Sequence, residues 1–263
     1  MNSSDEEKAV RLCIKLGNTQ GACLPINYQE YLTAAVYALL AVGDTNYARF
    51  LHDEGYKGEG SKTFKLFTFS GLRAPRRFSE GDRLRLPPGP LEWLISSPIE
   101  PFLTNLATGL LATGVLRVAA AAFPILEIQT LHPPALAETV RFTCLTPIVA
   151  ALPLLDGGTR YLRPSDGAAF SEAVRRNALN KHQRLYGKVL SDDRFALTFD
   201  PAYLARDRSG GTKLITYKDI KIVGAFAPFT VTGSPELMRV GYETGWGEKN
   251  AAGFGMVEVR NAV

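Results

Sequence analysis

The sequence has few of the residues that build metal centres and covalent cross-links. Among 263 residues there are three cysteines (Cys13, Cys23 and Cys144), with no Cys-x-x-Cys pair, and three histidines. This spacing excludes a zinc finger and a disulfide framework, and no cluster of acidic residues and histidines marks a metal-dependent nuclease. We therefore expect reduced thiols, no metal and no cofactor.

Long apolar runs and a secretory leader are also missing. The most apolar stretch, residues 106–126, is interrupted by Arg117 and Pro124 and is too broken to span a bilayer. The first eight residues are polar and largely acidic, unlike a signal peptide. These absences predict a cytoplasmic protein with no membrane partner. The net charge of +4 and the pI near 8.9 permit a polyanionic partner without requiring one.

Glycine, in contrast, is concentrated near the C-terminus. Five glycines lie within fifteen residues, at Gly241, Gly245, Gly247, Gly253 and Gly255. Backbone amides in such a loop can form a nest for an anionic oxygen, and Lys249 adds positive charge beside it. Neither the P-loop pattern nor the dinucleotide fingerprint fits, since Asn250 stands where the fingerprint needs its third glycine. On these residues alone, a glycine-rich hairpin with no ligand is the alternative.

The rest of the chain predicts strands and helices in two similar halves. Strands are expected at residues 9–16, 64–70, 91–96, 116–131, 140–151, 194–199, 213–223 and 225–231. A helix is expected after an Asn27–Glu30 capping box, with an apolar stripe from Leu32 to Leu40 that ends before Gly43-Asp44. Further helices are expected at 45–54, 99–115, 166–188 and 235–240. The first half gives the β-α-β, hairpin, α-β order of a ferredoxin-like unit. The paired prolines after His132 mark a linker, which predicts domains at 1–131 and 132–263.

One long motif resembles a known family. The run Gly-x-Gly-Glu-Lys-Asn-x-x-Gly-Phe-Gly-Met-Val, residues 245–257, is similar to the signature loop of the CRISPR-associated endoribonucleases of the repeat-associated mysterious protein superfamily. The run Leu-Thr-Pro-Ile at residues 145–148 resembles the start of that family's second domain. The resemblance covers essentially the whole chain. It implies an α+β fold of two tandem ferredoxin-like (RRM-like) domains, with the glycine-rich loop in the second and RNA across their shared face.

Histidine is the natural acid or base for RNA cleavage because its ordinary pKa lies near neutral pH. His132 falls in the linker, and His182 in a basic helix suits contact with phosphate or solvent. His52 lies in a Phe-Leu-His-acidic pattern that is similar to the family's catalytic site. The resemblance therefore implies that His52 is catalytic. As a lone histidine, its alternative role is to cap a helix C-terminus.

Two further positions match the family's active site. Tyr37 lies off the apolar stripe of its predicted helix, which frees its hydroxyl to orient the phosphate or donate a proton. Lys65 precedes an aromatic strand and could stabilise developing negative charge. Their alternatives are a half-buried tyrosine and a surface lysine, and Lys57 or Lys62 could replace Lys65.

Three groups of residues are candidates for binding RNA. The loop supplies Gly245, Gly247, Lys249, Asn250, Gly253 and Gly255. The arginine-rich stretch supplies Arg73, Arg76 and Arg77, which a solvated hairpin face explains equally well. The long helix supplies Lys181, Arg184 and Lys188 at i, i+3, i+7 spacing, although such charges often only face solvent. We expect Phe67 and Phe69 to lie in the core rather than to stack on bases.

The sequence thus predicts a metal-independent endoribonuclease that cuts CRISPR precursor RNA within its repeats. Attack by the 2′-OH would leave a 2′,3′-cyclic phosphate and a 5′-OH. The alternative is a non-catalytic repeat-RNA-binding scaffold subunit of a CRISPR effector complex, and the presence of His52 separates the two. The expected partner is the repeat RNA, and other effector-complex subunits or a second copy in a homodimer are further candidates.

Overall fold

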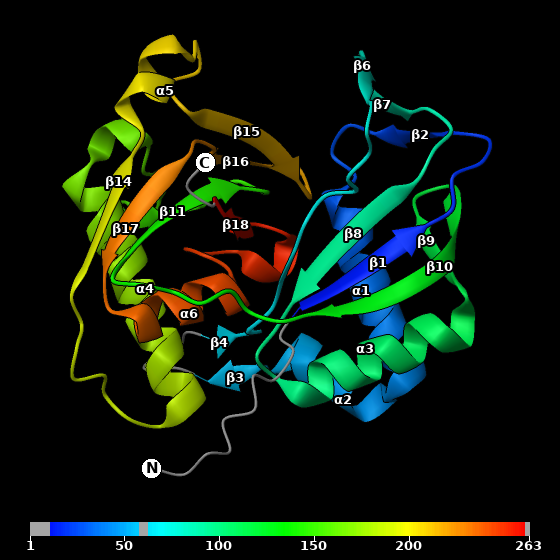
Figure 1. Ribbon diagram of the computed structural model, residues 1–263, viewed down its shortest axis with the longest axis horizontal. Helices are drawn as coiled ribbons and strands as arrows, with labels where there is room; N and C mark the ends of the chain where they lie inside the picture. Colours follow the sequence, from blue (N-terminus) through cyan, green and yellow to red (C-terminus); the bar gives the residue numbers. More distant parts are fainter. Residues whose placement is uncertain (1–10, 58–62, 261–263) are drawn as a thin grey trace.

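The computed structural model describes residues 11–57 and 63–260. Figure 1 shows two mixed α/β halves side by side, the first coloured blue to green and the second green to red. Each half contains an antiparallel sheet with helices packed against it. Residues 132–138 join the two sheets without regular structure. None of the helices in the described ranges has the length and apolar character needed to cross a bilayer.

The first sheet has the strand order β5-β8-β1-β10-β9, with all neighbours antiparallel. Its strands are β1 (Arg11–Leu16), β5 (Thr68–Phe69), β8 (Leu91–Ser96), β9 (Val115–Val118) and β10 (Ala121–Leu131). The helices of this half are α1 (Gln29–Gly43), α2 (Thr45–Asp53) and α3 (Glu100–Thr113). The apolar stripe of α1 and the strands bury one continuous core, which includes Phe67 and Phe69 at 0% exposure. The prediction that both phenylalanines are core residues is confirmed.

The second sheet has the order β14-β17-β11-β18. Its strands are β11 (Thr139–Cys144), β14 (Phe195–Phe199), β17 (Phe229–Gly233) and β18 (Val257–Val259), and its helices are α4 (Ala168–Tyr186) and α6 (Pro235–Thr244). In chain order the second half is β-α-β-β-α-β, and the first half has the same order with one extra strand, β9, before its last strand, β10. With the edge strand β9 set aside, both sheets place their second, third, first and fourth strands side by side. The prediction of two tandem ferredoxin-like domains is confirmed.

Short elements extend the two domains at opposite ends. They are β2 (Ala22–Pro25), β3 (Tyr56–Lys57), β4 (Thr63–Phe64), β6 (Phe78–Glu80), β7 (Arg83–Leu86), β12 (Ala151–Pro153), β13 (Thr159–Tyr161), β15 (Thr212–Tyr217), β16 (Ile220–Ala225), α5 (Pro201–Arg206) and the 3₁₀ turns η1 (Pro164–Asp166) and η2 (Asn250–Ala252). The hairpins β6–β7 and β15–β16 lie at one end of the molecule, and α2, β3 and β4 lie at the other (Figure 1).

Several local predictions are wrong. The stretch expected at 116–131 is the hairpin of β9 and β10, and the strand expected at 140–151 ends at Cys144. The strand expected at 64–70 is interrupted, because Leu66 takes a left-handed φ of 54° and separates β4 from β5. The strand expected at 213–223 is a hairpin that turns at Lys218 and Asp219, both with positive φ. The Asn27 capping box is absent: Tyr28 is the N-cap of α1, and the Asn27 Oδ1 instead accepts a hydrogen bond from the Thr216 amide at 3.4 Å.

Arg11 ties the two domains together through a buried guanidinium. It lies on β1 with 2% of its surface exposed, and it donates to the Val257 carbonyl at 3.1 Å and to the Tyr242 carbonyl at 3.2 Å. Its guanidinium also lies 4.0 Å from the centre of the Tyr242 ring. An apolar cluster of Cys13, Leu94 and Met256 continues the contact. The two sheets are therefore fixed against each other by buried contacts.

Candidate active site and RNA-binding surface

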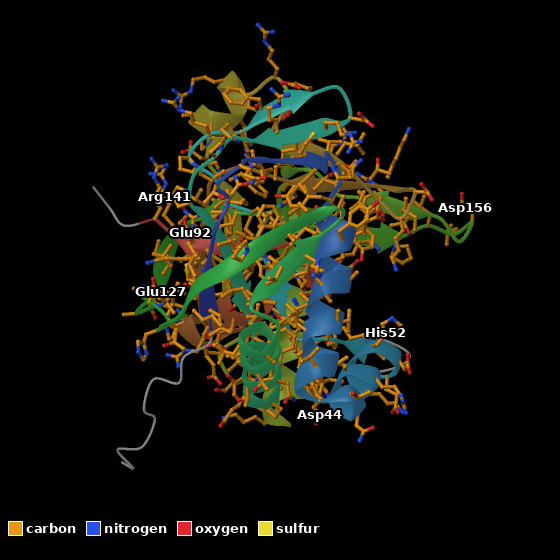
Figure 2. The ribbon with its side chains drawn as sticks, turned by 90° about the vertical axis from the view of Figure 1, so that its right-hand side faces the viewer. Asp44, His52, Glu92, Glu127, Arg141 and Asp156 are labelled. Atoms are coloured by element: carbon orange, nitrogen blue, oxygen red, sulfur yellow. The ribbon has the colours of Figure 1, made fainter. Side chains whose placement is uncertain are left out.

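His52 lies in the last turn of α2, and the start of this helix is fixed by a side-chain cap. The Asp44 carboxylate accepts hydrogen bonds from the amides of Asn46 and Tyr47 at 2.9 and 3.0 Å. The His52 side chain is 67% exposed and projects from the lower part of the molecule (Figure 2). Its Nδ1 is 2.8 Å from Asp53 Oδ1, and its Nε2 has no hydrogen-bond partner among the described residues. Asp53 therefore favours a proton on Nδ1 and leaves Nε2 available to a substrate.

Tyr37 packs against His52 from α1. The two ring centres are 5.2 Å apart with the rings at 82°, and Tyr37 also makes an edge contact with Phe67 at 6.2 Å. Burial raises the pKa of Tyr37 to about 12, with a smaller contribution from Tyr217. The phenol is therefore protonated at neutral pH. It can donate a hydrogen bond, or a proton, to a phosphate placed beside the imidazole.

Lys65 reaches the same place from the segment between β4 and β5. Its Nζ donates to the His52 carbonyl oxygen at 2.7 Å, so Lys65, rather than the His52 ring, satisfies a carbonyl at the end of α2. Burial lowers the pKa of Lys65, and the nearby Asp53 opposes that shift. A Cβ on Gly55, which has φ +65°, would lie 2.9 Å from the Lys65 Cδ, so this approach requires glycine.

The structure thus brings Tyr37, His52 and Lys65 together from three separate segments. Of the two alternative lysines, Lys57 is exposed on β3, and Lys62 lies outside the described residues. The catalytic roles of Tyr37, His52 and Lys65 stay predictions. The arrangement provides a neutral hydroxyl, an accessible imidazole nitrogen and an ammonium group around one site, which is a set suited to in-line phosphoryl transfer without a covalent intermediate.

Several amides of the glycine-rich loop are already bonded within the protein. The Gly255 amide donates to Pro147 O at 2.8 Å, the Gly253 amide to Asn250 O at 2.8 Å and the Glu248 amide to Val149 O at 2.7 Å. The four loop glycines 245, 247, 253 and 255 all have positive φ. A Cβ on Gly247 would lie 2.2 Å from the Val149 carbonyl oxygen. The glycines therefore permit close backbone packing, and the amides of Gly253 and Gly255 are used within the protein. Contact of the loop with phosphate stays a prediction.

Lys181 is buried beneath this loop rather than exposed on a basic helix face. It is 3% exposed and donates to Gly245 O at 2.7 Å, Gly247 O at 3.0 Å and Asn250 Oδ1 at 2.6 Å. Burial lowers the pKa of Lys181 to about 7, and Glu248 opposes the shift. Lys181 is therefore not part of the exposed basic face that was predicted for Lys181, Arg184 and Lys188. Arg184 is exposed on α4, and Lys188 is exposed beyond the end of that helix.

Asn250 is a second fixed point of the loop. Its Nδ2 donates to Trp246 O at 3.1 Å and to Phe254 O at 3.0 Å, and its Oδ1 accepts from Lys181. Lys249, between Asn250 and Glu248, is exposed with φ 59°. Of the predicted RNA-binding residues in the loop, Lys249 is thus the one whose side chain faces solvent.

His182 links two helices instead of facing phosphate or solvent. It is fully buried on α4, and its Nε2 lies 2.7 Å from Glu236 Oε1 on α6. Its ring packs against Tyr186 with 4.7 Å between ring centres. The prediction of an exposed His182 is therefore wrong, because the basic composition of the helix gave no sign of what packs on that side.

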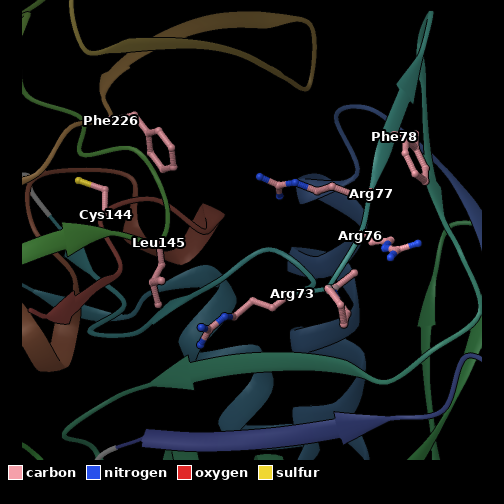
Figure 3. Close-up of a pocket in the computed structure, with 9 residues that line it drawn as sticks. Arg73, Arg76, Arg77, Phe78, Cys144, Leu145 and Phe226 are labelled. Atoms are coloured by element: carbon pink, nitrogen blue, oxygen red, sulfur yellow. The ribbon is translucent and has the colours of Figure 1, made fainter. Parts of the chain in front are cut away.

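The arginine-rich stretch lies at the end of the molecule away from His52. A cavity of about 760 Å³ is lined there by Arg73, Arg76, Arg77, Leu145 and Phe226, among other residues. Figure 3 shows Arg73 and Arg77 extending toward the second domain, while Arg76 turns the other way. Arg73 is engaged by Glu258, at 2.7 Å across the domain boundary. The structure does not place these arginines beside the catalytic candidates.

Comparison with known proteins identifies the family. Residues 23–129 match the model for the N-terminal part of the CRISPR-associated protein Cas6, and residues 131–259 match the model for its C-terminal part. A CRISPR-associated endoribonuclease Cas6 of Methanocaldococcus jannaschii is 27% identical over 252 residues, covering 95% of this chain and 92% of the relative. The CRISPR-associated endoribonuclease Cas6 of Pyrococcus furiosus is 28% identical over 238 residues, covering 90% and 83%.

Solved structures agree with the sequence matches. A CRISPR-associated protein Cas6 superposes with a TM-score of 0.76 at 28% identity, covering 96% of this chain and 99% of that one. A Cas6-related protein from Pyrococcus furiosus gives a TM-score of 0.82 at 22% identity, covering 95% and 98%, and supports the fold alone. The matches to both family models together cover residues 23–129 and 131–259, and the chain belongs to the Cas6 family.

Proposed function

We propose that this chain is an endoribonuclease that cleaves CRISPR precursor RNA within its repeats to release guide RNAs. The observation that carries the proposal is the meeting of His52, Tyr37 and Lys65 at one accessible place in a Cas6-family fold. The names of two relatives that cover most of the chain, both endoribonucleases, support it.

The chemistry follows from what each side chain offers. The 2′-oxygen of the RNA attacks the adjacent phosphorus, and the bond to the 5′-oxygen breaks. The products are a 2′,3′-cyclic phosphate and a 5′-OH. His52, with Asp53 beside its Nδ1, presents Nε2 to take the 2′-OH proton or to protonate the leaving oxygen. Tyr37 positions the phosphate, and Lys65 stabilises the charge that develops on it. No step requires a bound metal ion.

The RNA contacts divide between the two ends of the molecule. Near the catalytic residues, Lys249, Arg184 and Lys188 offer exposed positive charge on the second domain. At the other end, Arg76 and Arg77 offer exposed charge beside the large cavity. Gly245, Gly247, Gly253, Gly255, Asn250 and Lys181 act indirectly, because they hold the loop that carries Lys249. A repeat RNA of sufficient length would contact both ends.

The test is cleavage of labelled repeat RNA from the protein's own locus in excess EDTA. We expect full activity, and end-group analysis should find a 2′,3′-cyclic phosphate upstream and a 5′-OH downstream. One 2′-deoxy substitution just upstream of the cut should stop cleavage without weakening binding. A 5′-phosphate product, or activity that needs added magnesium, would contradict the mechanism. Tight binding with no cleavage would favour the scaffold subunit instead.

A further inference from the structure

A second cavity, of about 290 Å³, lies beside Lys65 between the two domains. Residues 63–66 of the first domain form one wall, and residues 248–251 of the glycine-rich loop form another, with Asn177 and Lys181 of α4 completing it. Ligand sites begin at roughly 300 Å³, so this space suits one nucleotide rather than a helix. Because Lys65 contacts His52, a nucleotide held here would be next to the cleaved bond.

Two hydrogen-bond acceptors that line this cavity, on Asn177 and Glu248, have no partner among the described residues, while Lys249 places an exposed donor at its edge. The Asn177 Oδ1 is buried and has no hydrogen-bond partner within the part of the chain that the structure describes. The Glu248 carboxylate makes no hydrogen bond or ion pair with residues 11–57 and 63–260. Lys181, in contrast, already donates to three oxygen atoms of the loop. A buried acceptor without a partner costs about 1–3 kcal/mol, so this wall is complementary to a ligand that brings donors.

The backbone that carries Glu248 is held in place on both sides of the residue. The Glu248 amide is bonded to Val149 O at 2.7 Å, and the carbonyl of the preceding residue, Gly247, is bonded to Lys181 at 3.0 Å. Neither contact uses the Glu248 side chain. Asn177 lies one helical turn before Lys181 on α4, so both side chains face the same wall.

We propose that this cavity reads the base of one nucleotide flanking the cut, and that Glu248, supported by Asn177, selects guanine. The inference rests on the proposed ribonuclease function. Single-stranded RNA bases are recognised through their Watson–Crick edges. On that edge guanine presents two adjacent donors, N1–H and the 2-amino group, which match the two oxygens of a carboxylate. Adenine, cytosine and uracil each present one donor group next to acceptors, and those acceptors would face the carboxylate unfavourably.

The test is single-turnover cleavage of a panel of repeat RNAs. Each nucleotide within two positions of the cut is replaced in turn by guanine, adenine, cytosine, uracil or inosine, and inosine removes only the 2-amino group. We expect one position at which the parental protein prefers guanine over inosine by roughly tenfold, the value of one hydrogen bond to a charged group. Glu248→Gln should slow cleavage of the guanine RNA at that position and reduce the guanine-to-inosine ratio to near one.

Controls separate the possible failures. Glu138→Gln removes an exposed carboxylate outside the cavity and should keep the parental guanine preference. Equal melting temperatures of the parental protein and Glu248→Gln exclude misfolding. If the parental protein cuts no RNA of the panel, the proposed function fails. If it cuts all bases equally at every position, or if Glu248→Gln slows every RNA by the same factor, cleavage stands and the base-reading pocket is overturned.

Discussion

At the residue scale, Lys65 and His52 are coupled through the backbone. The Lys65 ammonium donates to the His52 carbonyl oxygen, while the His52 ring faces solvent beside Asp53. A substitution at Lys65 therefore changes both the charge near the phosphate and the end of α2. A substitution of the His52 side chain changes only the imidazole, which makes His52 the cleaner probe of the chemistry.

We expect His52→Ala to lower the single-turnover cleavage rate by about 10²–10⁴, the usual loss for one general acid or base. RNA affinity should be nearly unchanged, since charge contacts with phosphates dominate such interfaces. The measurements are a cleavage time course at saturating protein and a dissociation constant. His132→Ala, in the linker, is the matched control and should cleave at the parental rate. Parental activity in His52→Ala would show that another group does the chemistry.

Tyr37 allows its hydroxyl to be tested apart from its ring. Tyr37→Phe keeps the edge contact with His52 and removes an oxygen that makes no hydrogen bond among the described residues, so the melting temperature should not fall. The cleavage rate should fall by about tenfold or more if the hydroxyl contacts the phosphate, the value of one charge-assisted hydrogen bond. A parental rate in Tyr37→Phe together with a slow Tyr37→Ala would limit Tyr37 to packing the imidazole.

At the scale of elements, the glycine-rich loop is held by side chains that are distant in sequence. Lys181 of α4 and Asn250 of η2 bond to its carbonyls, and the positive-φ glycines let it pass within contact of Val149 and Trp246. The loop is therefore a rigid wall of the site, and its conformation depends on α4.

Two glycines with similar φ distinguish a steric clash from backbone strain. A Cβ added to Gly247, which has φ +68°, would lie 2.2 Å from Val149 O. A Cβ added to Gly114, at the end of α3 with φ +64°, would meet no atom within 4 Å. Gly114→Ala should lower stability by about 1 kcal/mol, the ordinary cost of a left-handed alanine. Gly247→Ala should lower the melting temperature clearly further. Equal shifts in thermal denaturation would mean that the loop moves away from Val149 easily.

A buried carboxyl on α6 makes stability depend on pH. Glu243 is 4% exposed, and burial raises its pKa to about 7, with Arg239 opposing the shift. Because the folded pKa lies above the unfolded value of 4.5, the stabilising proton is fully bound below pH 4.5 and is lost as the pH rises through about 7. Between pH 4 and pH 8, the parental protein should lose on the order of 3 kcal/mol relative to Glu243→Gln.

Denaturant unfolding of both proteins at the two pH values measures this difference. The opposite trend from Lys181, whose pKa is lowered to about 7, is common to both proteins and cancels in the comparison. A constant difference between pH 4 and pH 8 would mean that Glu243 is solvated in the folded state.

Local sequence patterns predicted where helices and strands lie, but not which distant segments pack against them. The strand at β1 and the helix stripe of α1 follow from spacing, while the candidates His52, Tyr37 and Lys65 follow from the resemblance to the family. The burial of Lys181 does not, because i, i+3, i+7 spacing defines a helix face without saying what packs on it. The break at Leu66 and the domain-joining role of Arg11 likewise depend on contacts between distant segments, and the cavity with Asn177 and Glu248 exists only when the two domains meet.

At the scale of the whole molecule, the candidate site depends on the angle between the domains. The cavity beside Lys65 has walls from both halves, and Arg11 fixes their relation. Arg11→Met keeps an unbranched apolar stem but removes the guanidinium, which leaves the Val257 and Tyr242 carbonyls without this donor. We expect a loss of about 2–4 kcal/mol in unfolding free energy. Cleavage should fall as well, because the cavity loses its shape.

Arg73→Met is the matched comparison. It also removes a cation that joins the domains, but its bridge to Glu258 is 41% exposed on the arginine side. An exposed ion pair contributes about 0–1 kcal/mol, so the loss should be small. Denaturation curves of the two variants decide the point. Equal losses of unfolding free energy in the two variants would mean that the buried Arg11 guanidinium stabilises the domain interface no more than the exposed Arg73 ion pair does.

The interface between the two domains limits how such a chain can evolve. Phe69 of the first domain fills the space that a side chain on Gly253 of the second would need, with 2.5 Å to its nearest ring carbon, and Thr68 donates to Phe254 O at 2.9 Å. These contacts depend on a backbone carbonyl and on the absence of a side chain at a glycine. Substitutions of surface residues therefore cannot recreate them between one of these domains and a different partner domain. Neither half can therefore be recombined with a foreign partner as an independent module, and a chain nicked within residues 132–138 should remain a single particle.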